Sequence, residues 1–314
     1  EPKNPYLTRS NLVLLIIWRP INLSPSITTI LPNEIHQASF LSMGQSGMSM
    51  AVLGSGSKGN AALVRCGSTH ILVDAGFSAK QLVLRMNALG VSPEQLDAIL
   101  ITHEHSDHAQ GVDVLLRQRS VPVFANALTR EALSHKMKSS ITWKVFHSGQ
   151  EFSIGDLMIN SFRIPHDAAE PVGFIITGAS SRLSMVSDVG HVTNLMRESL
   201  RGSGGLYVEA NYDQALLERD TKRPWATKQR IVSRHGHLSN SQTADLLAEI
   251  ACEKLKIVML SHLSSDCNSP DIASQAISNS LKQCGFDQVD VFCAHQDEPS
   301  HWIDIPITGS EELS

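Results

Sequence analysis

The chain has 314 residues, of which 42% are hydrophobic, so it is long enough to bury a sizeable core as one large domain or two small ones. Its formal net charge of -5 excludes a protein that binds nucleic acid over its whole surface, and leaves only a local basic patch for that purpose. The five cysteines are an odd number, lie far apart and form no CxxC pair, so we expect reduced thiols and a cytoplasmic protein rather than a disulfide scaffold.

The first 47 residues show no sustained hydrophobic period and contain five prolines. Their apolar stretch, residues 12–18, is far shorter than the ~20 residues that span a bilayer, and no small-residue cleavage site follows it closely. We therefore predict that residues 1–47 are a disordered or non-native extension before a start at Met43, Met48 or Met50. We expect one domain at 48–306, a flexible tail at 307–314 and no association with membranes.

From residue 49, short apolar runs alternate with helical patterns. We predict strands at 50–53, 61–66, 70–74, 96–101 and 121–124, and helices at 78–89, 109–119 and 126–138. The glycine-rich turn 54–60 joins the first two strands. It either lies near a phosphate or metal-bound water or is a plain hairpin turn, and it lacks the Gly-Lys-Ser/Thr of a P-loop.

The second half continues the alternation without a linker or a repeat. We predict strands at 146–152, 157–164, 172–177, 182–186, 205–210, 256–260, 289–294 and 301–305, and helices at 195–200, 211–219, 239–253 and 270–284. This order of elements predicts an α/β fold. Its functional residues are expected at the carboxyl ends of the strands, where open α/β sheets place their sites.

A cluster of potential metal ligands follows the strand at 96–101. Four of them, His103, His105, Asp107 and His108, fall within six residues, and imidazole with carboxylate suits zinc, manganese or iron. His166, Asp188 and His262 each follow another apolar run. Singly, each is more typical of an ordinary loop residue. Together, the seven side chains are enough for two metal ions with open positions for water.

The pattern HxHxDH, followed by a distant His, Asp and His, resembles the metallo-β-lactamase superfamily over residues 50–305. That resemblance implies a single-domain, four-layered αββα sandwich. It also implies two divalent metal ions, zinc or manganese, with one held by His103, His105 and His166, the other by Asp107, His108 and His262, and both bridged by Asp188. The lactamases usually place a cysteine at one ligand position, so antibiotic hydrolysis is disfavoured.

Finer features resemble the YycJ (WalJ) branch of that superfamily, whose members are regarded as DNA exonucleases. They are the segments 55–60, 165–173, 236–240 and 261–264, and the pair Cys267-Asn268. The resemblance implies a 5'-to-3' DNA exonuclease with a role in DNA repair. Tyr212 departs from the branch, where we expect a histidine, and the role of this position stays open.

A local excess of positive charge supports a nucleic-acid substrate independently of the resemblance. Between Glu218 and His237 the only acids are Glu218 and Asp220, against six basic residues, Arg219, Lys222, Arg223, Lys228, Arg230 and Arg234. The alternative is a solvated surface loop. Trp225 in this stretch is more typical of a packing anchor than of a side chain that stacks on a base.

The implied mechanism is in-line attack on a phosphodiester by a metal-bridging hydroxide. Asp107 would orient the water, and His237 would contact phosphate or protonate the leaving oxygen, unless it caps the helix at 239–253. The residues predicted to bind substrate are Ser55, Ser57, Asn60, Lys228, Arg230, Arg234, His237, Ser239 and Asn240. Two other functions stay open: a hydrolase of a small thioester, lactone or cyclic phosphodiester, and a metal-dependent sensor without turnover. Metal identity, cleavage polarity and oligomeric state are also open.

Overall fold

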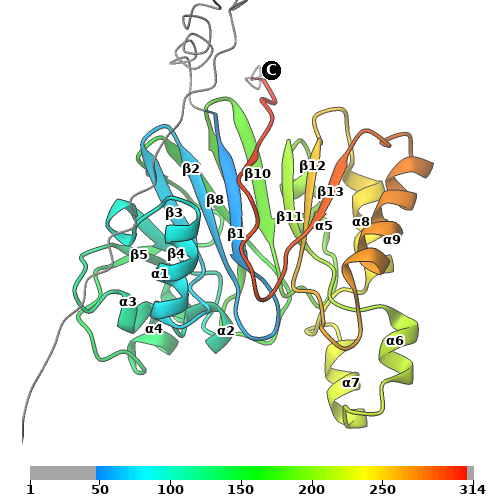
Figure 1. Ribbon diagram of the computed structural model, residues 1–314, viewed down its shortest axis with the longest axis horizontal. Helices are drawn as coiled ribbons and strands as arrows, with labels where there is room; N and C mark the ends of the chain where they lie inside the picture. The colour runs from blue at the N-terminus through cyan, green and yellow to red at the C-terminus, as the bar shows by residue number, and fades with distance from the viewer. Residues whose placement is uncertain (1–46, 310–314) are drawn as a thin grey trace, which may run out of the picture. The chain divides into compact units, whose positions relative to one another are not determined.

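A computed structural model describes residues 47–309, so the predictions for the N-terminal extension lie outside the described residues, as does most of the predicted tail. Two seven-stranded sheets form the centre of the domain (Figure 1). The first sheet has the order β14 (Ile303–Asp304), β1 (Ser49–Gly54), β2 (Ala61–Cys66), β3 (Thr69–Val73), β4 (Ala98–Leu100), β5 (Val123–Asn126) and β6 (Trp143–Phe146). The second has the order β13 (Asp290–Cys293), β12 (Ile257–Ser261), β11 (Gly205–Glu209), β10 (Ser181–Val186), β9 (Val172–Gly178), β8 (Leu157–Arg163) and β7 (Glu151–Ile154).

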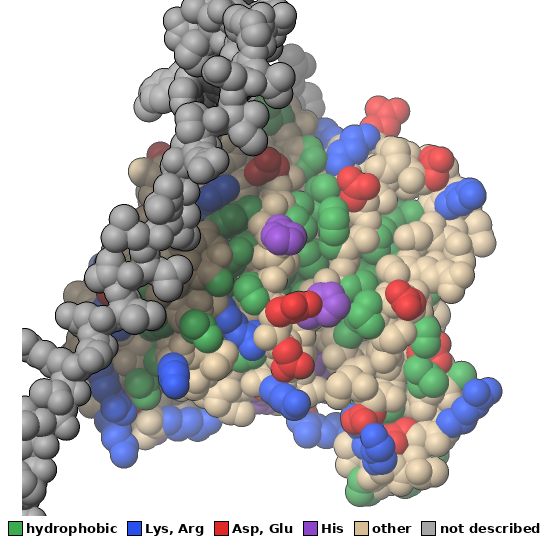
Figure 2. Space-filling model, viewed as in Figure 1, with side chains coloured by type: hydrophobic (Ala, Val, Ile, Leu, Met, Phe, Trp, Pro, Cys, Tyr) green, Lys and Arg blue, Asp and Glu red, His purple; other side chains and the backbone are tan. Residues whose placement is uncertain are grey.

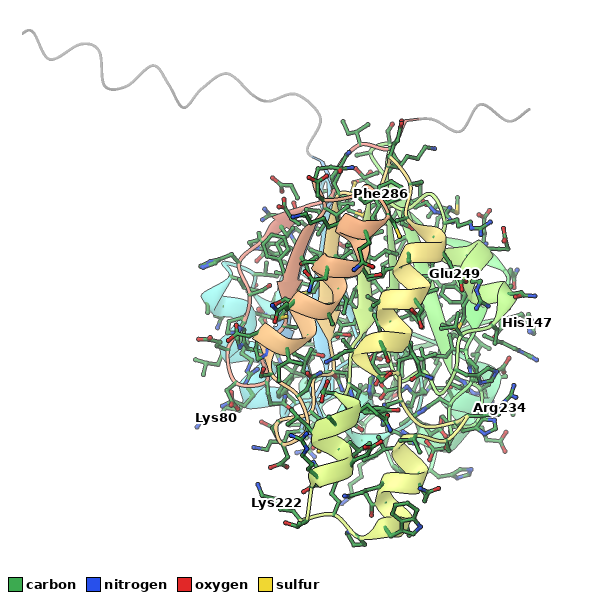
Figure 3. The ribbon with its side chains drawn as sticks, turned by 90° about the vertical axis from the view of Figure 1, so that its right-hand side faces the viewer. Lys80, His147, Lys222, Arg234, Glu249 and Phe286 are labelled. Atoms are coloured by element: carbon green, nitrogen blue, oxygen red, sulfur yellow. The ribbon has the colours of Figure 1, made fainter. Side chains whose placement is uncertain are left out.

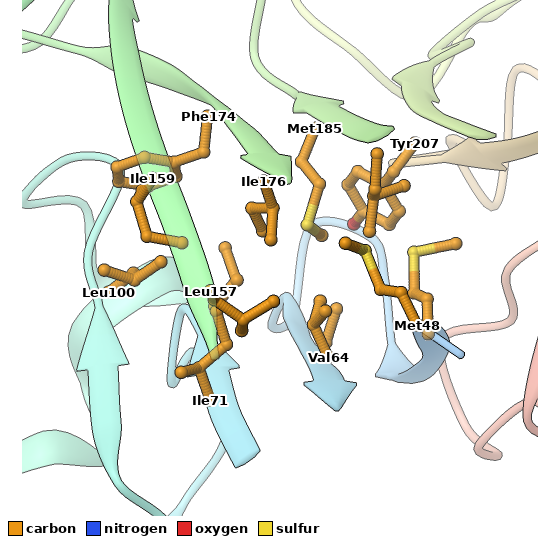
Figure 4. Close-up of a cluster of buried hydrophobic side chains, with 14 of the residues drawn as sticks. Met48, Val64, Ile71, Leu100, Leu157, Ile159, Phe174, Ile176, Met185 and Tyr207 are labelled. Carbon is orange, nitrogen blue, oxygen red and sulfur yellow. The ribbon is translucent and has the colours of Figure 1, made fainter. Parts of the chain in front are cut away.

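The inner faces of the two sheets pack against each other and form the central core (Figure 4). Val64, Ile71 and Leu100 of the first sheet face Ile159 and Phe174 of the second, and all five side chains are fully buried. Successive residues of a strand point to opposite faces of the sheet. Helices cover the outer face of each sheet, so the central strands carry apolar side chains on both faces.

Helices form the two outer layers. The first sheet is covered by α1 (Ala79–Ala88), α2 (Ser106–Ala109), α3 (Val112–Leu115) and α4 (Ala127–Ser134), and the second by α5 (Asn194–Leu200), α8 (Asn240–Ile250) and α9 (Pro270–Gln283). A 3₁₀ turn lies at Pro93–Gln95. The layers confirm the predicted αββα sandwich. In the part of the chain that the structure describes, no helix is long and apolar enough to cross a membrane.

Most predicted elements agree with the structure to within a few residues, but two predictions are wrong. The run 146–152 is not one strand, because a turn at 147–150 separates β6 from β7. The run 109–119 is not one helix. It is broken at Gly111, whose N–H donates to Ala75 O outside the helix (2.9 Å) and where a Cβ would lie 2.2 Å from Phe77 O.

The topology brings the ends of the key strands to one edge. Strands β3, β4 and β5 are mutually parallel, and so are β10, β11, β12 and β13. Strand β8 runs in the same direction as β10, because both are antiparallel to β9. The loops that follow β3, β4, β8, β10, β11 and β12 therefore meet at this edge. It lies at the bottom of Figure 1.

Two further helices, α6 (Gln214–Arg219) and α7 (Trp225–Ile231), form a hairpin that projects beyond this edge next to the second sheet (Figure 1). The sequence pattern predicts a helix at 211–219 but none at 225–231, so α7 is an addition to the predicted elements. Proline precedes α7, where its fixed φ favours a helix start.

Candidate metal centre

The structure brings all seven predicted metal ligands together at the carboxyl edge of the sheets. Ligand atoms of His103, His105 and His166 lie within 4.8 Å of one another, and the same holds for the set Asp107, His108 and His262. These are the two sets implied by the resemblance.

Asp188 lies between the two sets, as a bridging ligand would. Its Oδ2 is 2.7 Å from His108 Nε2, and its Oδ1 is 3.3 Å from His262 Nε2. It also forms a group of possible ligands with His103 and His108. Asp107 completes the second set, since its Oδ2 lies 3.7 Å from both His108 Nε2 and His262 Nε2.

The buried polar atoms of this cluster fit divalent metal ions. His103 Nε2 and His262 Nε2 are buried and lack a hydrogen-bond partner, and the buried Asp188 Oδ2 faces His108 Nε2, a nitrogen of another predicted ligand. A buried polar atom without a hydrogen-bond partner lowers the stability of the folded protein. A bound metal ion would supply the missing partner for these atoms. The donor set, five imidazoles and two carboxylates, suits zinc or manganese.

Burial and neighbouring charges set the protonation of His103 and Asp188 as metal binding requires, whereas the carboxylates of Asp74 and Asp188 outweigh burial and raise the pKa of His108 well above its ordinary value. Burial lowers the pKa of His103 well below its ordinary value, which keeps the imidazole neutral with a lone pair for a metal. Burial alone would raise the pKa of Asp188, but the neighbouring His262 and His108 outweigh it and hold the pKa well below its usual range. Asp188 therefore remains a carboxylate.

Three residues at this edge adopt left-handed backbone conformations that non-glycine residues rarely use. Asp74, Asp188 and His262 have φ angles of 59°, 58° and 53°. Each such residue costs about 1–3 kcal/mol and persists only where its surroundings over-determine it. The backbone therefore stores strain at the point where the strands β3, β10 and β12 deliver these side chains.

Asp74 is a site residue that the sequence reasoning missed. Its Oδ2 lies 2.7 Å from His108 Nδ1, and both of its oxygens accept hydrogen bonds from the hydroxyl of Thr102. Thr102 Oγ1 is in turn 3.0 Å from His103 Nδ1. A carboxylate behind a metal-binding imidazole fixes the ring orientation and raises its basicity. The sequence does hold one indication of this role. Asp74 directly follows the apolar strand β3, and β3 is the neighbour of β4, which precedes the histidine cluster.

Glu209 is the second residue that was missed. It is fully buried at the end of β11, accepts a hydrogen bond from Val189 N (2.7 Å) and lies 2.6 Å from His237 Nδ1. Burial lowers the pKa of His237, but the Glu209 carboxylate outweighs burial and raises this pKa to about 9. The His237 ring also stacks on His262, with ring centroids 5.0 Å apart. The structure thus places His237 beside the metal ligands and does not place it as the cap of α8, whose N-cap is Ser239.

The glycine-rich turn at 54–60 offers little to an anion. Five of its backbone N–H groups donate within the protein, namely those of Ser55, Gly56, Lys58, Gly59 and Asn60. The alternative of a backbone phosphate cradle is therefore not supported. The turn does lie against the cluster, because Asn60 Nδ2 is 3.1 Å from His108 Nε2 and Ser55 Oγ accepts from His262 N (2.8 Å).

Close backbone packing fixes this turn to the ligand loop. Asn60 N donates to Asp107 O (2.7 Å), and Gly76 N donates to Asn60 O (2.9 Å). A Cβ at Gly76 would lie 1.6 Å from Asp107 O, so only glycine fits there. Ser55 and Asn60 are both buried and joined by a hydrogen bond from Ser55 Oγ to Asn60 Oδ1 (2.8 Å), and Asn60 Nδ2 contacts the same nitrogen of His108 that faces Asp188.

The remaining residues that were predicted to bind substrate divide into buried and exposed groups. Ser239 and Asn240 are buried, the first as the N-cap of α8 and the second bonded to Asn268. Ser57 is exposed at the tip of the glycine-rich turn. Substrate contact by any of them stays a prediction.

The basic residues of the stretch are partly paired. Arg230 forms an ion pair with Asp167 (2.7 Å), Arg234 Nη2 lies 3.1 Å from His191 Nε2, and Lys228 Nζ donates to a backbone carbonyl of α6. Of these three contacts, only the ion pair of Arg230 offsets positive charge, because the partners of Arg234 and Lys228 carry no negative charge.

Tyr212 packs rather than replacing the expected imidazole. Its side chain is buried in a small cluster with Leu217 and Cys267. Burial raises the pKa of its hydroxyl, which therefore stays protonated. The position that holds a histidine in the resembling branch is thus a packing position in this chain.

The two-sheet sandwich with a His/Asp cluster at the carboxyl ends of its strands defines a metal-dependent hydrolase of the metallo-β-lactamase fold. The family model described as "Beta-lactamase superfamily domain" matches residues 69–263, and the chain belongs to that superfamily.

Within the superfamily, curated relatives match most of the chain. The exodeoxyribonuclease YycJ of Bacillus anthracis is 34% identical over 255 residues, which are 81% of this chain and 96% of the relative. The exodeoxyribonuclease WalJ of Streptococcus pneumoniae serotype 2 is 35% identical over 246 residues, which are 77% of this chain and 91% of the relative. These matches confirm the resemblance to the YycJ (WalJ) branch.

Solved structures confirm the fold. The metallo-β-lactamase fold protein YhfI from Bacillus subtilis superposes with a TM-score of 0.63 at 17% identity, covering 82% of this chain and 99% of its own. The short form of human tRNase Z gives a TM-score of 0.57 at 16% identity, covering 82% of this chain and 100% of its own. At such identities the likeness concerns the fold alone.

Proposed function

We propose that this protein is a DNA exonuclease that uses two divalent metal ions, and that it degrades DNA in the 5'-to-3' direction. The observation that carries the proposal is the extent of the match to two exodeoxyribonucleases, which reaches 96% and 91% of their lengths. Such a match extends over nearly the whole of each relative rather than over one motif.

The seven side chains of the cluster would hold the metals in the two sets described above, with Asp188 shared between them. Metal ions held there would activate a water molecule and neutralise charge on a phosphodiester. Asp107 has the most exposed carboxylate among the acids of the cluster, with 25% of its side chain accessible against 3% for Asp188. It is therefore the carboxylate that would orient an attacking water.

His237 would donate a proton to the leaving oxygen or to a non-bridging oxygen of the phosphate. Its Nδ1 is held by Glu209, which leaves Nε2 for the substrate, and 20% of its side chain is accessible. With a pKa of about 9, its ring carries a proton at neutral pH. Glu209 is a positioning residue, since it acts on the substrate only through His237.

The proposal is tested with one preparation of the full chain. Its metal content is measured, and it is then assayed on DNA labelled at the 5' or the 3' end, in single- and double-stranded form, beside a thioester. We expect about two metal ions per chain, and release of labelled mononucleotide at the earliest times only from 5'-labelled DNA. Hydrolysis of the thioester with intact DNA would refute the proposal, and early release of mononucleotide from 3'-labelled DNA would refute the polarity.

The variant Asp107→Ala links the activity to this site. It should lose DNA hydrolysis by at least about 100-fold, because a ligand and the orienting carboxylate are removed together. Asp245→Ala is the matched control, since Asp245 is an exposed acid on α8, away from the cluster. Equal activities of the two variants would contradict the assignment.

A further inference from the structure

We infer that Trp225 is a stacking platform for a base of single-stranded DNA, two or three nucleotides from the phosphate that lies at the metal centre. The inference rests on the proposed nuclease function and adds to it a second contact point for the substrate. Three observations support it: the aromatic ring is exposed, basic residues lie near it in the chain, and backbone contacts join α7 to the cluster.

The ring of Trp225 is unusually exposed. It is 73% accessible, and α7 has no buried residue at all, so the packing role expected for this tryptophan is wrong. Val232 lies seven residues further on, close to the same face of the helix, and is 40% accessible. A large aromatic ring left in water loses the favourable free energy of burial, and such exposed apolar surface is typical of a contact site.

The charge around the ring favours a polyanion over an apolar partner. The hairpin carries five basic residues and Arg234 follows it, and the ion pairs with Asp167, Asp220 and Asp266 neutralise only some of these six. Basic side chains appear beside acidic ones on this projection in Figure 2, and Lys222 is labelled on it in Figure 3. Positive charge combined with an aromatic face is the combination by which proteins hold single strands without sequence preference.

The C-terminal end of α7 is fixed directly to the catalytic cluster. His237 N donates to Ile231 O (2.9 Å), and Gly236 O lies 3.2 Å from Nδ1 of the metal ligand His166. A Cβ at Gly236 would lie 2.2 Å from Ile231 O, so this contact requires glycine. Arg230 adds the ion pair with Asp167, the neighbour of His166.

The length of α7 gives the spacing. Trp225 precedes Ile231 by six residues, which is ~9 Å along a helix axis at 1.5 Å per residue. Ile231 is joined to the cluster through His237 and does not itself lie at the metal site, so this distance is the shortest separation of the ring from a phosphate held there. At ~3.4 Å per stacked nucleotide it corresponds to roughly two or three nucleotides. A strand whose phosphate lies at the cluster therefore places a base near Trp225 only when it is longer than a dinucleotide.

The test compares KM for a hexathymidylate and for a dithymidylate, both with a 5'-phosphate. Trp225→Ala should raise KM for the hexamer by about 5- to 150-fold, the effect expected from the loss of one stacked base. KM for the dimer should rise much less, since it does not reach the ring. Trp225→Phe should retain most of the advantage of the hexamer, and Leu195→Ala, which alters an exposed apolar side chain of α5, should behave as the wild type.

Direct binding gives a second readout that does not depend on turnover. In the presence of a chelator, hexathymidylate should quench the fluorescence of the wild type more than that of Trp225→Phe. Equal KM values for wild type and Trp225→Ala on the hexamer would overturn the inference. A change in the sedimentation coefficient of Trp225→Ala without a change in KM would also overturn it, and would assign the ring to protein association. If the wild type itself neither bound nor cleaved the hexamer, the proposed nuclease function would fail first.

Discussion

Removal of the His237 imidazole should impair DNA hydrolysis far more than hydrolysis of a substrate whose leaving group needs no proton. The ring lies beside the ligands His166 and His262, with its Nδ1 held 2.6 Å from a carboxylate oxygen of the fully buried Glu209. An alkoxide leaving from DNA needs a proton, whereas p-nitrophenolate leaves without one. His237→Ala should therefore lose about 10²- to 10⁴-fold in kcat on DNA and much less on thymidine 5'-p-nitrophenyl phosphate.

The Glu209→Gln variant tests the origin of the raised pKa. A hydrogen bond to a charged group contributes about 1.5–3 kcal/mol, and one pKa unit corresponds to about 1.4 kcal/mol. The substitution should therefore lower the pKa of His237 from about 9 by roughly one to two units. A general acid works only while protonated, so the fall of kcat with rising pH should begin one to two pH units lower in the variant. The glutamine oxygen can still accept from Val189 N, which preserves the second contact of this side chain.

The assay is a pH profile of kcat from pH 6 to 10 on both substrates, with thermal unfolding as the control for folding. Equal losses on DNA and on the p-nitrophenyl ester in His237→Ala would refute proton donation, and would leave His237 as a support for the stacked ring of His262. An unshifted profile in Glu209→Gln would refute the proposed control of the pKa by Glu209.

Three further predictions concern metal affinity and stability. Asp74→Asn removes the charged partner of His108 and should weaken metal binding by about 10- to 100-fold in a competition titration with a chelator, and an unchanged affinity would show that other contacts hold the ring. Phe174→Ala leaves a cavity between the two sheets and should lower the free energy of unfolding by about 3–5 kcal/mol in urea, and a loss below 1 kcal/mol would mean that the core collapses around it. The amide of Ser139 holds the pKa of Asp113 down to about 2, so the carboxylate stabilises the fold above about pH 4 and this contribution disappears as the pH falls to 2. The stability of Asp113→Asn should consequently vary less with pH in that window, and an identical pH dependence would disprove this account.

The sequence by itself was sufficient for the class of fold and for the side chains that the structure gathers into one His/Asp cluster. His103, His105, Asp107 and His108 lie within six residues, in the loop after β4 and the helix α2, so their convergence needs only a strand that ends before them. His166, Asp188 and His262 were recognisable because each follows an apolar strand, and carboxyl ends of such strands meet at one edge. The alternation of apolar strands with amphipathic helices is a local pattern, and local patterns are what a single sequence displays.

Only the tertiary structure revealed the acidic residues that pair with the histidines of the site. Asp74 and Glu209 look like ordinary acids at strand ends, and their pairing with His108 and His237 depends on strands far apart in the chain. The sequence of the glycine-rich turn is compatible with anion binding, and only the structure shows that most of its N–H groups already donate within the protein. The exposure of Trp225 was likewise hidden, because a tryptophan in an unpatterned stretch is buried or exposed according to what packs against it. Burial and pairing are non-local quantities, and this is the physical reason why the cluster of predicted ligands could be recognised in the sequence while the side chains that pair with it could not.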